Sequence, residues 1–149
     1  MQQPTTDIIE SLLEKPCWVI DFLPHQVPAD QGRQFFKIEK LLLQSPHINQ
    51  LYDKFATIVL QLYCYYDIHL CMNDDDVWTF NPEPEQLLNA VHSVLGQKQH
   101  LVILIEATST LLTLSGDDTH ITIYNPSPEI QPLLHQLASA QGLFLWKPQ

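Results

Sequence analysis

The sequence is poor in glycine and in arginine. Its four glycines lie far apart, so no glycine-rich loop that cradles a phosphate can be drawn. Arg33 is the single arginine, and the chain therefore has no cluster of guanidinium groups to clamp a phosphate. These two absences argue against a nucleotide-binding protein, and we expect no cofactor.

Cysteine is also scarce, and its three copies have no paired spacing. Cys17, Cys64 and Cys71 lie among aromatic and aliphatic residues, which predicts buried, reduced thiols in a reducing compartment. His69 and Cys71 form an isolated pair and not a zinc set. No Gly-x-Ser-x-Gly elbow is present, and a cysteine–histidine dyad needs a spatial adjacency that no motif in the sequence indicates. The sequence thus gives no sign of nucleophilic catalysis.

Long apolar runs are missing as well. No stretch approaches the roughly 20 apolar residues that a transmembrane helix needs. The first four residues, Met-Gln-Gln-Pro, lack the basic and apolar regions of a signal peptide. We therefore expect a cytoplasmic protein that does not enter a membrane.

Basic residues are outnumbered. Seventeen acidic and seven basic residues give a formal net charge of −10 at pH 7. Between Asp67 and Glu129 there are ten acidic residues and one basic residue, Lys98. Such a surface repels the phosphate backbone of nucleic acids, so we expect no nucleic-acid binding. It suits a basic protein partner instead, although an acidic surface also serves solubility alone.

What the chain does contain is enough apolar residues for a core. Of its 149 residues, 45% are hydrophobic and 9% aromatic, which fits one domain over residues 1–149. Periodicity predicts an α+β fold, with three or four helices packed on a mostly antiparallel sheet of about five to seven strands. The expected strands lie near residues 17–23, 65–71, 77–80, 101–105, 110–114, 120–124 and 143–146. The expected helices lie near residues 7–15, 47–63, 85–95 and 130–141.

Residues 34–43 are ambiguous. Phe36, Ile38 and Leu42 fit the alternation of polar and apolar positions in a strand. Phe35, Ile38, Leu41 and Leu42 also fit the spacing of an amphipathic helix. We favour the strand for this segment.

An internal echo is the clearest pattern in the chain. Residues 80–85, Phe-Asn-Pro-Glu-Pro-Glu, match residues 124–129, Tyr-Asn-Pro-Ser-Pro-Glu, at an offset of 44. Each copy runs from an acidic turn through a short strand to a helix and a second apolar strand. Asparagine and proline commonly end a strand and begin a helix, so the motif could have arisen twice independently. The alternative is a strand–helix–strand duplication, and in either case the two segments should look alike locally.

Two acidic turns, residues 73–76 and 115–118, precede these copies. Gly116 in the second turn is expected to supply the positive φ of a hairpin. Exposed carboxylates beside an aromatic anchor are typical of a docking surface. The side chains that we expect to face a partner are Asp74, Asp75, Asp76, Asp117, Asp118 and Trp78.

Metal binding and acid–base catalysis are the other uses of such carboxylates. The turns lack the combination of a central glycine and a twelfth-position glutamate that a calcium loop needs, so we expect no metal site. Asp21 and Glu106 adjoin strongly apolar strands, where burial would raise a carboxyl pKa and mark a catalytic candidate. We expect both carboxylates to face solvent at the ends of their strands.

The sequence favours a small non-catalytic binding protein. In concrete form this is an inhibitor or immunity-type protein, whose acidic surface covers a basic partner such as a nuclease. A hydrolase-like enzyme is the first alternative, and it requires Asp74, Asp118 and His120 to converge in one pocket. A structural homo-oligomer is the second alternative, in which exposed aromatic residues pair between copies.

Overall fold

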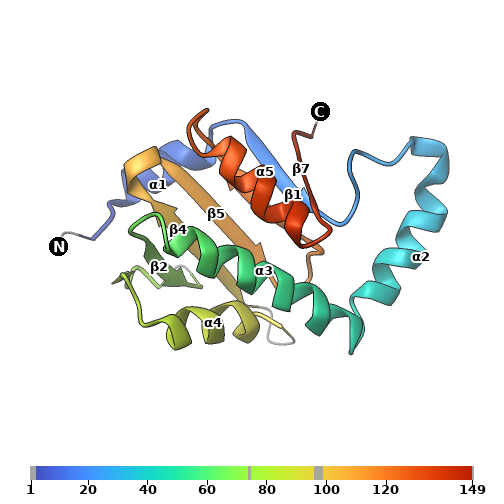
Figure 1. The fold of residues 1–149 in the computed structure, drawn as a ribbon, viewed down its shortest axis with the longest axis horizontal. Coiled ribbons are helices and arrows are strands. Elements are labelled where there is room, and N and C mark those ends of the chain that lie inside the picture. The colour runs from blue at the N-terminus through green and yellow to red at the C-terminus, as the bar shows by residue number, and fades with distance from the viewer. Residues whose placement is uncertain (1–2, 74, 96–98, 149) are drawn as a thin grey trace.

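The computed structural model of the chain describes residues 3–73, 75–95 and 99–148. Its strands form one sheet in the order β3-β2-β4-β5-β6-β1-β7, and every neighbouring pair is antiparallel (Figure 1). The strands are β1 (Cys17–Asp21), β2 (His69–Met72), β3 (Thr79–Phe80), β4 (His100–Ile105), β5 (Thr110–Ser115), β6 (His120–Tyr124) and β7 (Phe144–Trp146). The predicted α+β class and the antiparallel sheet are confirmed.

Five α-helices accompany this sheet in the described part of the chain, one more than the sequence predicted. They are α1 (Thr6–Leu13), α2 (Gly32–Leu42), α3 (His47–Tyr63), α4 (Pro84–Ser93) and α5 (Gln131–Ala140). Two short 3-10 helices are also present, η1 (Ala29–Gln31) and η2 (Glu106–Thr108). The extra helix is α2, which covers the segment that we expected to be a strand.

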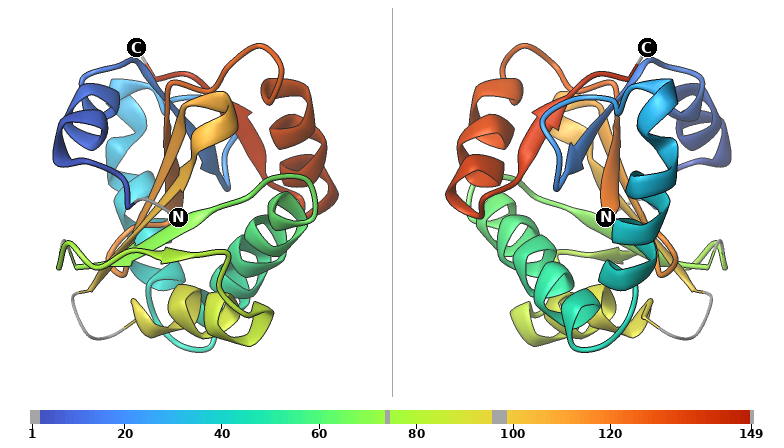
Figure 2. Two further views of the ribbon diagram at one scale, coloured as in Figure 1. Left: turned by 90° about the vertical axis from the view of Figure 1, so that its left-hand side faces the viewer. Right: turned by 90° about the vertical axis from the view of Figure 1, so that its right-hand side faces the viewer.

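The two faces of the sheet are covered unequally. Figure 2 shows α3, α4 and α5 on one face and α1 and α2 on the other. On the first face, Phe55, Leu87 and Leu134 from the three helices belong to one large buried cluster. Ile20 and Ile103 of the sheet belong to the same cluster, so this interface is the main core of the protein.

The second face has a smaller core under α1. Leu12 is the one buried residue of α1, and it packs in a cluster with Leu104 and Leu111 of the sheet. The helix begins at a side-chain cap, since the Thr5 hydroxyl accepts a hydrogen bond from the Ile8 N–H at 3.2 Å. Because α1 is only two turns long, the far part of this face is left to α2 and the loop before it.

Helix α2 corrects our interpretation of residues 34–43. None of its residues is fully buried: Phe35 and Leu42 are half-buried, while Phe36 and Ile38 are exposed. A helix satisfies its backbone hydrogen bonds internally, so it can stand at the periphery without a neighbouring strand. A strand in the same place would have exposed a row of unpaired backbone groups.

The turn between β5 and β6 is held from beneath. Tyr52 of α3 is fully buried, and its hydroxyl donates to the carbonyl oxygen of Asp118 at 2.9 Å. In the same turn, a Cβ on Gly116 would lie 1.9 Å from the carbonyl oxygen of Val94. Glycine is therefore needed for a close approach to the end of α4, and not for the positive φ that we expected there.

The internal echo corresponds to a repeated arrangement of strands. We call β2, β3, α4 and β4 the first unit, and β1, β6, α5 and β7 the second unit. In each unit the central strand, β2 or β1, lies between two antiparallel strands that are joined through the helix. This is a split strand–helix–strand arrangement. The predicted local likeness is confirmed, and it extends to the order of the strands.

The two asparagine–proline junctions share one backbone geometry. Asn81 and Asn125 both have positive φ, 46° and 58° respectively. The backbone N–H of each donates to the carbonyl oxygen of the residue just before the central strand, Ile68 at 2.9 Å and Pro16 at 3.1 Å. Asparagine tolerates this left-handed conformation better than most residues, so it can turn the chain out of the strand and towards the helix.

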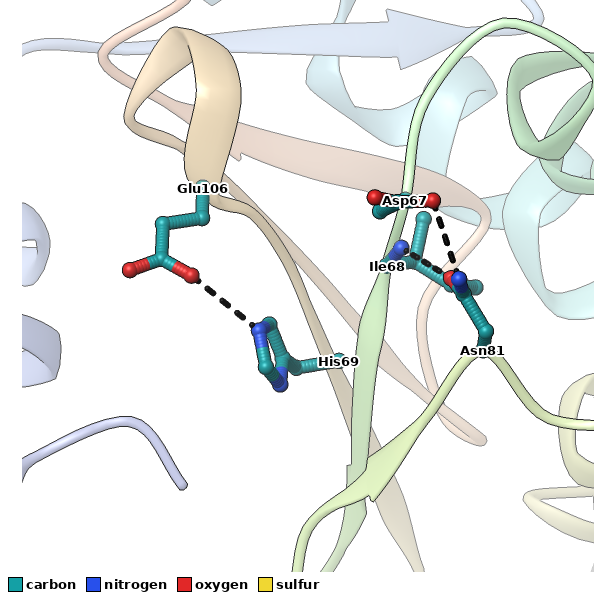
Figure 3. Close-up of polar contacts among 5 residues, drawn as sticks. All are labelled: Asp67, Ile68, His69, Asn81 and Glu106. Carbon is teal, nitrogen blue, oxygen red and sulfur yellow. Dashed lines mark hydrogen bonds and ion pairs between the residues drawn. The ribbon is translucent and has the colours of Figure 1, made fainter. Parts of the chain in front are cut away.

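The side chains at the two junctions differ. Oδ1 of Asn81 accepts a hydrogen bond from the Ile68 N–H at 3.0 Å (Figure 3). Asn125 cannot repeat this bond because Pro16 has no N–H. Its Nδ2 donates to the carbonyl oxygen of Ser109 at 2.9 Å instead. The repeated feature is therefore the backbone turn, and each side chain stabilises it in its own way.

Candidate functional site

The two acidic turns lie close together at one end of the sheet. They flank the start of β4: the Asn73 N–H donates to the His100 carbonyl at 3.0 Å, and the Gly116 N–H donates to the Gln99 carbonyl at 3.3 Å. Since one strand separates them, the backbones of the two turns are about 10 Å apart. We define the acidic edge as Asp75, Asp76, Asp117 and Asp118.

Most of the acidic edge is open to solvent. Asp75, Asp76 and Asp117 are exposed, and Asp118 is half-buried. Oδ1 of Asp75 accepts a hydrogen bond from the Val77 N–H at 3.0 Å, which holds this turn in shape. Burial raises the pKa of the Asp118 carboxyl above its ordinary value. The structure therefore brings the predicted carboxylates of both turns to one surface.

Two of the six expected partner-facing residues need separate comment. Trp78 is half-buried and packs against the smaller core cluster on the second face, so it belongs in part to the core. Asp74 lies outside the described residues.

The cysteines occupy three different environments. Cys71 is buried, Cys17 is half-buried and Cys64 is exposed, so the expectation of three buried thiols is wrong for Cys64. Cys64 follows the last turn of α3, where its side chain leaves the core. Burial, reinforced by Asp75, raises the pKa of the Cys71 thiol to about 11. Cys71 is thus protonated at neutral pH and is a poor nucleophile.

In the described ranges, no three His, Cys, Asp or Glu side chains gather closely enough to hold a metal ion.

A pocket of about 520 Å³ lies on the second face of the sheet, and we call it the α2 pocket. Residues of β1, β6 and β7 form its floor, and the loop after β1, η1 and α2 form its walls. Its volume falls within the range of small-molecule sites. The lining residues that bear on its chemistry are Asp21, Phe35, Phe36, Glu39, His120 and Trp146.

Asp21 is the central carboxylate of the α2 pocket. It is the last residue of β1 and lies directly opposite His120 of β6 and Phe144 of β7. Its Oδ1 accepts a hydrogen bond from the Phe22 N–H at 2.8 Å. Burial raises the pKa of Asp21, the Phe22 hydrogen bond and His120 oppose this rise, and Glu39 adds to it. Our expectation that Asp21 faces open solvent is wrong, because α2 and its loop close over the end of the strand.

Aromatic rings make up much of the pocket wall. Phe35 and Phe36 of α2 lie with ring centroids 5.6 Å apart, and Phe35 stacks on Phe22 at 6.3 Å with nearly parallel rings. Trp146 of β7 completes the aromatic lining. The basic side chains of α2 do not take part, since no lysine or arginine lines the pocket as described.

The enzyme alternative required Asp74, Asp118 and His120 to share one pocket. His120 lines the α2 pocket and Asp118 does not, although the two lie close enough to interact electrostatically. The carboxylate that meets His120 in the pocket is Asp21. The sequence could have suggested Asp21 as a site residue, since it ends an apolar strand. The helix that covers Asp21 was not expected, because we predicted a strand for the residues that form α2.

A second polar group lies near the opposite end of the sheet. His69 of β2 is buried, and its Nε2 lies 3.2 Å from Oε2 of Glu106, as Figure 3 shows. Its ring also contacts Phe80, with centroids 5.0 Å apart. Glu106 is exposed, which confirms that this carboxylate faces solvent. The pairing of Glu106 with His69 was not predicted, because the residues are 37 positions apart and no local signal joins them.

Figure 3 also shows that Asn81 joins the start of β2 to the junction after β3, where its Nδ2 donates to Oδ1 of Asp67 at 2.9 Å. This group is separate from the His69–Glu106 pair. Its bonds stay within the first unit, so we assign it to the framework of the fold.

Comparison of the chain with protein-family models, with curated proteins and with solved structures finds no match. Among the helices of the described ranges, none is both long enough and apolar enough to pass through a bilayer.

Proposed function

We propose that the protein is a non-catalytic binding protein whose acidic edge docks onto a basic surface of a partner protein. The single observation that supports this proposal is the placement of two acidic turns, distant in sequence, at one end of the sheet. The described residues of these turns carry exposed carboxylates and no lysine or arginine. Surfaces of one charge attract their complement over distances near the Debye length of roughly 10 Å, which speeds association.

The partner class follows from the charge. Proteins that bind nucleic acid present clustered lysine and arginine to the phosphate backbone. An acidic edge that covers such a surface competes with the nucleic acid. The expected role is therefore inhibition of a basic, nucleic-acid-binding protein such as a nuclease.

The proposal is tested by comparing two charge-matched variants. The edge variant carries Asp75→Asn, Asp76→Asn and Asp117→Asn, changes that keep the turn-forming side-chain oxygens. The control removes three exposed carboxylates from α1 and the residue that follows it, by Asp7→Asn, Glu10→Gln and Glu14→Gln. Both variants have the same net charge, so they separate the local surface from the overall field.

A partner is first captured from extract of the native cell with the wild-type chain and then purified. We expect its association rate to fall at least about tenfold for the edge variant and little for the control, because steering depends on the charges that face the partner. Rising salt should slow the wild type and bring it towards the edge variant. An association rate that both variants change equally, or that salt leaves unchanged, contradicts the proposal.

An acid–base enzyme that uses the α2 pocket is a second candidate. A half-buried carboxyl with a raised pKa, opposite an imidazole in a concave site, is the observation in its favour. A panel of ester, amide, phosphate-ester and glycoside substrates tests it. Hydrolysis that Asp21→Asn or His120→Ala abolishes, and that the edge variant retains, would replace the binding proposal with this one.

A further inference from the structure

The α2 pocket is acidic, because two carboxylates line it and no lysine or arginine of the described residues does. Asp21 from β1 and Glu39 from α2 both line it, and they lie near enough for Glu39 to raise the pKa of Asp21. The other ionisable side chains of the described lining are His25 and His120. Two carboxylates in a partly apolar pocket are a costly arrangement unless a cation joins them.

The aromatic lining favours the same kind of ligand. The face of an aromatic ring carries negative charge density, and tryptophan attracts cations more strongly than the other rings. Phe35, Phe36 and Trp146 line the pocket together with the two carboxylates. Phe36 is 65% exposed, so its ring is accessible to a ligand that enters the pocket.

Trp146 connects the aromatic lining to the Asp21 carboxylate. Its side chain lies close enough to Asp21 to lower the pKa of that carboxyl, against the effect of burial. The indole Nε1 is itself buried, so the part of Trp146 that a ligand can meet is the face of its ring.

We propose that the α2 pocket binds an organic cation, an ammonium group on a small apolar body. The ammonium group lies between the carboxylates of Asp21 and Glu39 and against the aromatic rings. This site is distinct from the acidic edge, so the proposal does not depend on the partner protein.

The test uses choline, a quaternary ammonium ion with a hydroxyl group, titrated into the full chain labelled with nitrogen-15. The indole N–H signal of Trp146 reports on the pocket. That of Trp78, which does not line the pocket, serves as the internal reference. We expect a saturable shift at Trp146 and none at Trp78. The absence of a saturable Trp146 shift up to tens of millimolar choline would overturn the proposal.

Two comparisons separate a cation site from a merely apolar or acidic one. The neutral alcohol in which carbon replaces the ammonium nitrogen of choline has the same shape, and it should bind roughly tenfold more weakly. Glu39→Gln should weaken choline binding by a similar factor, while Asp30→Asn should not. Asp30 is an exposed neighbour on η1 that loses the same charge without lining the pocket.

Each of these results decides the matter. Equal affinity for choline and the neutral alcohol would show an apolar pocket and overturn the proposal. Equal weakening by Glu39→Gln and Asp30→Asn would show a response to net charge alone and also overturn it. The variants must retain the dispersed amide spectrum of the wild type, and Glu39 lies on the peripheral helix α2, where loss of folding is not expected.

Discussion

The two units of the sheet share a topology and differ in how their central strands end. In the first unit, β2 ends at Met72, and Asn73 begins a short acidic turn that leads to β3. In the second unit, β1 ends at Asp21. The next strand of this unit, β6, begins only at His120, after the whole of the first unit in the sequence. Asp21 and Asn73 occupy equivalent positions, each four residues after the start of the central strand.

This difference accounts for the pocket. In the first unit the position is closed by two hydrogen bonds to His100. Oδ1 of Asn73 accepts from the His100 N–H at 2.9 Å, and the Asn73 N–H donates to the His100 carbonyl oxygen at 3.0 Å. In the second unit the chain leaves through a loop and α2, which stand over the strand end and enclose space around Asp21. The same strand arrangement thus gives a closed turn in the first unit, where the central strand is followed directly by its neighbour in the sequence. It gives a candidate site in the second unit, where a long segment separates the two strands.

The largest expected effect is at the place where the turn between β5 and β6 meets the first unit. Gly116→Ala would put a Cβ against the backbone of Val94, at the end of the first unit's helix. Neither partner is a flexible side chain, so we expect the free energy of unfolding to fall by about 3 kcal/mol. Gly32→Ala is the matched control, because its Cβ would meet Phe36 at an ordinary 3.8 Å. Urea denaturation that shows equal changes for both variants would contradict a tight contact between this turn and the end of α4.

A second prediction compares the two junctions. Asn81→Ala and Asn125→Ala both place alanine at a positive φ, which costs about 1–2 kcal/mol in each unit. Asn81→Ala also leaves the N–H of Ile68 without its side-chain acceptor, and Ile68 is fully buried. We therefore expect Asn81→Ala to destabilise the protein by about 1 kcal/mol more than Asn125→Ala does.

The glycine variants separate the two contributions. Glycine accepts a positive φ without strain, so Asn81→Gly and Asn125→Gly should recover the backbone cost and leave only the loss of side-chain hydrogen bonds. The gap between the two junctions should persist in this pair when unfolding is followed in urea. A gap that closes would mean that backbone strain alone distinguishes them.

The smallest expected effect concerns Asp21 and pH. Because its folded pKa is raised above the ordinary value of 3.8, the folded protein holds this proton more tightly than the unfolded chain does. The stabilisation is fully present at low pH and is lost as pH rises from about 3.8 through the folded pKa. Asp21→Asn removes this loss, so its stability relative to the wild type should increase with pH and then level off. Parallel curves for the two proteins from acid to neutral pH would show that the pocket does not hold Asp21 as described.

The sequence allowed several parts of this fold to be predicted. The strand around residues 101–105 was expected from five consecutive apolar residues, and the helix over 47–63 from its regular apolar spacing. Both are dictated by contacts between near neighbours. The likeness of the two asparagine–proline junctions could be predicted for the same reason, since the turn depends on two or three adjacent residues.

Residues 34–43 show where this reasoning failed. Their apolar positions fit both periods, and the deciding factor was the lack of a neighbouring strand with which to pair. The prediction for Gly116 was wrong for a similar reason, because the role of this residue depends on its contact with Val94 at the end of α4. The candidate sites were partly visible: the acidic turns were identified, whereas their proximity and the enclosure of Asp21 were not.

By itself, the sequence determined the helices and strands with unambiguous periodicity, the two junctions and the acidic turns, because each follows from a short stretch of chain. Tertiary structure decided that β1 joins β6 and β7, that the acidic turns share one end of the sheet, and that α2 roofs a pocket over Asp21. These features depend on pairing between residues as far apart as Asp21 and His120. Which strands pair depends on how well each possible arrangement buries the whole core. No short stretch of sequence contains this information.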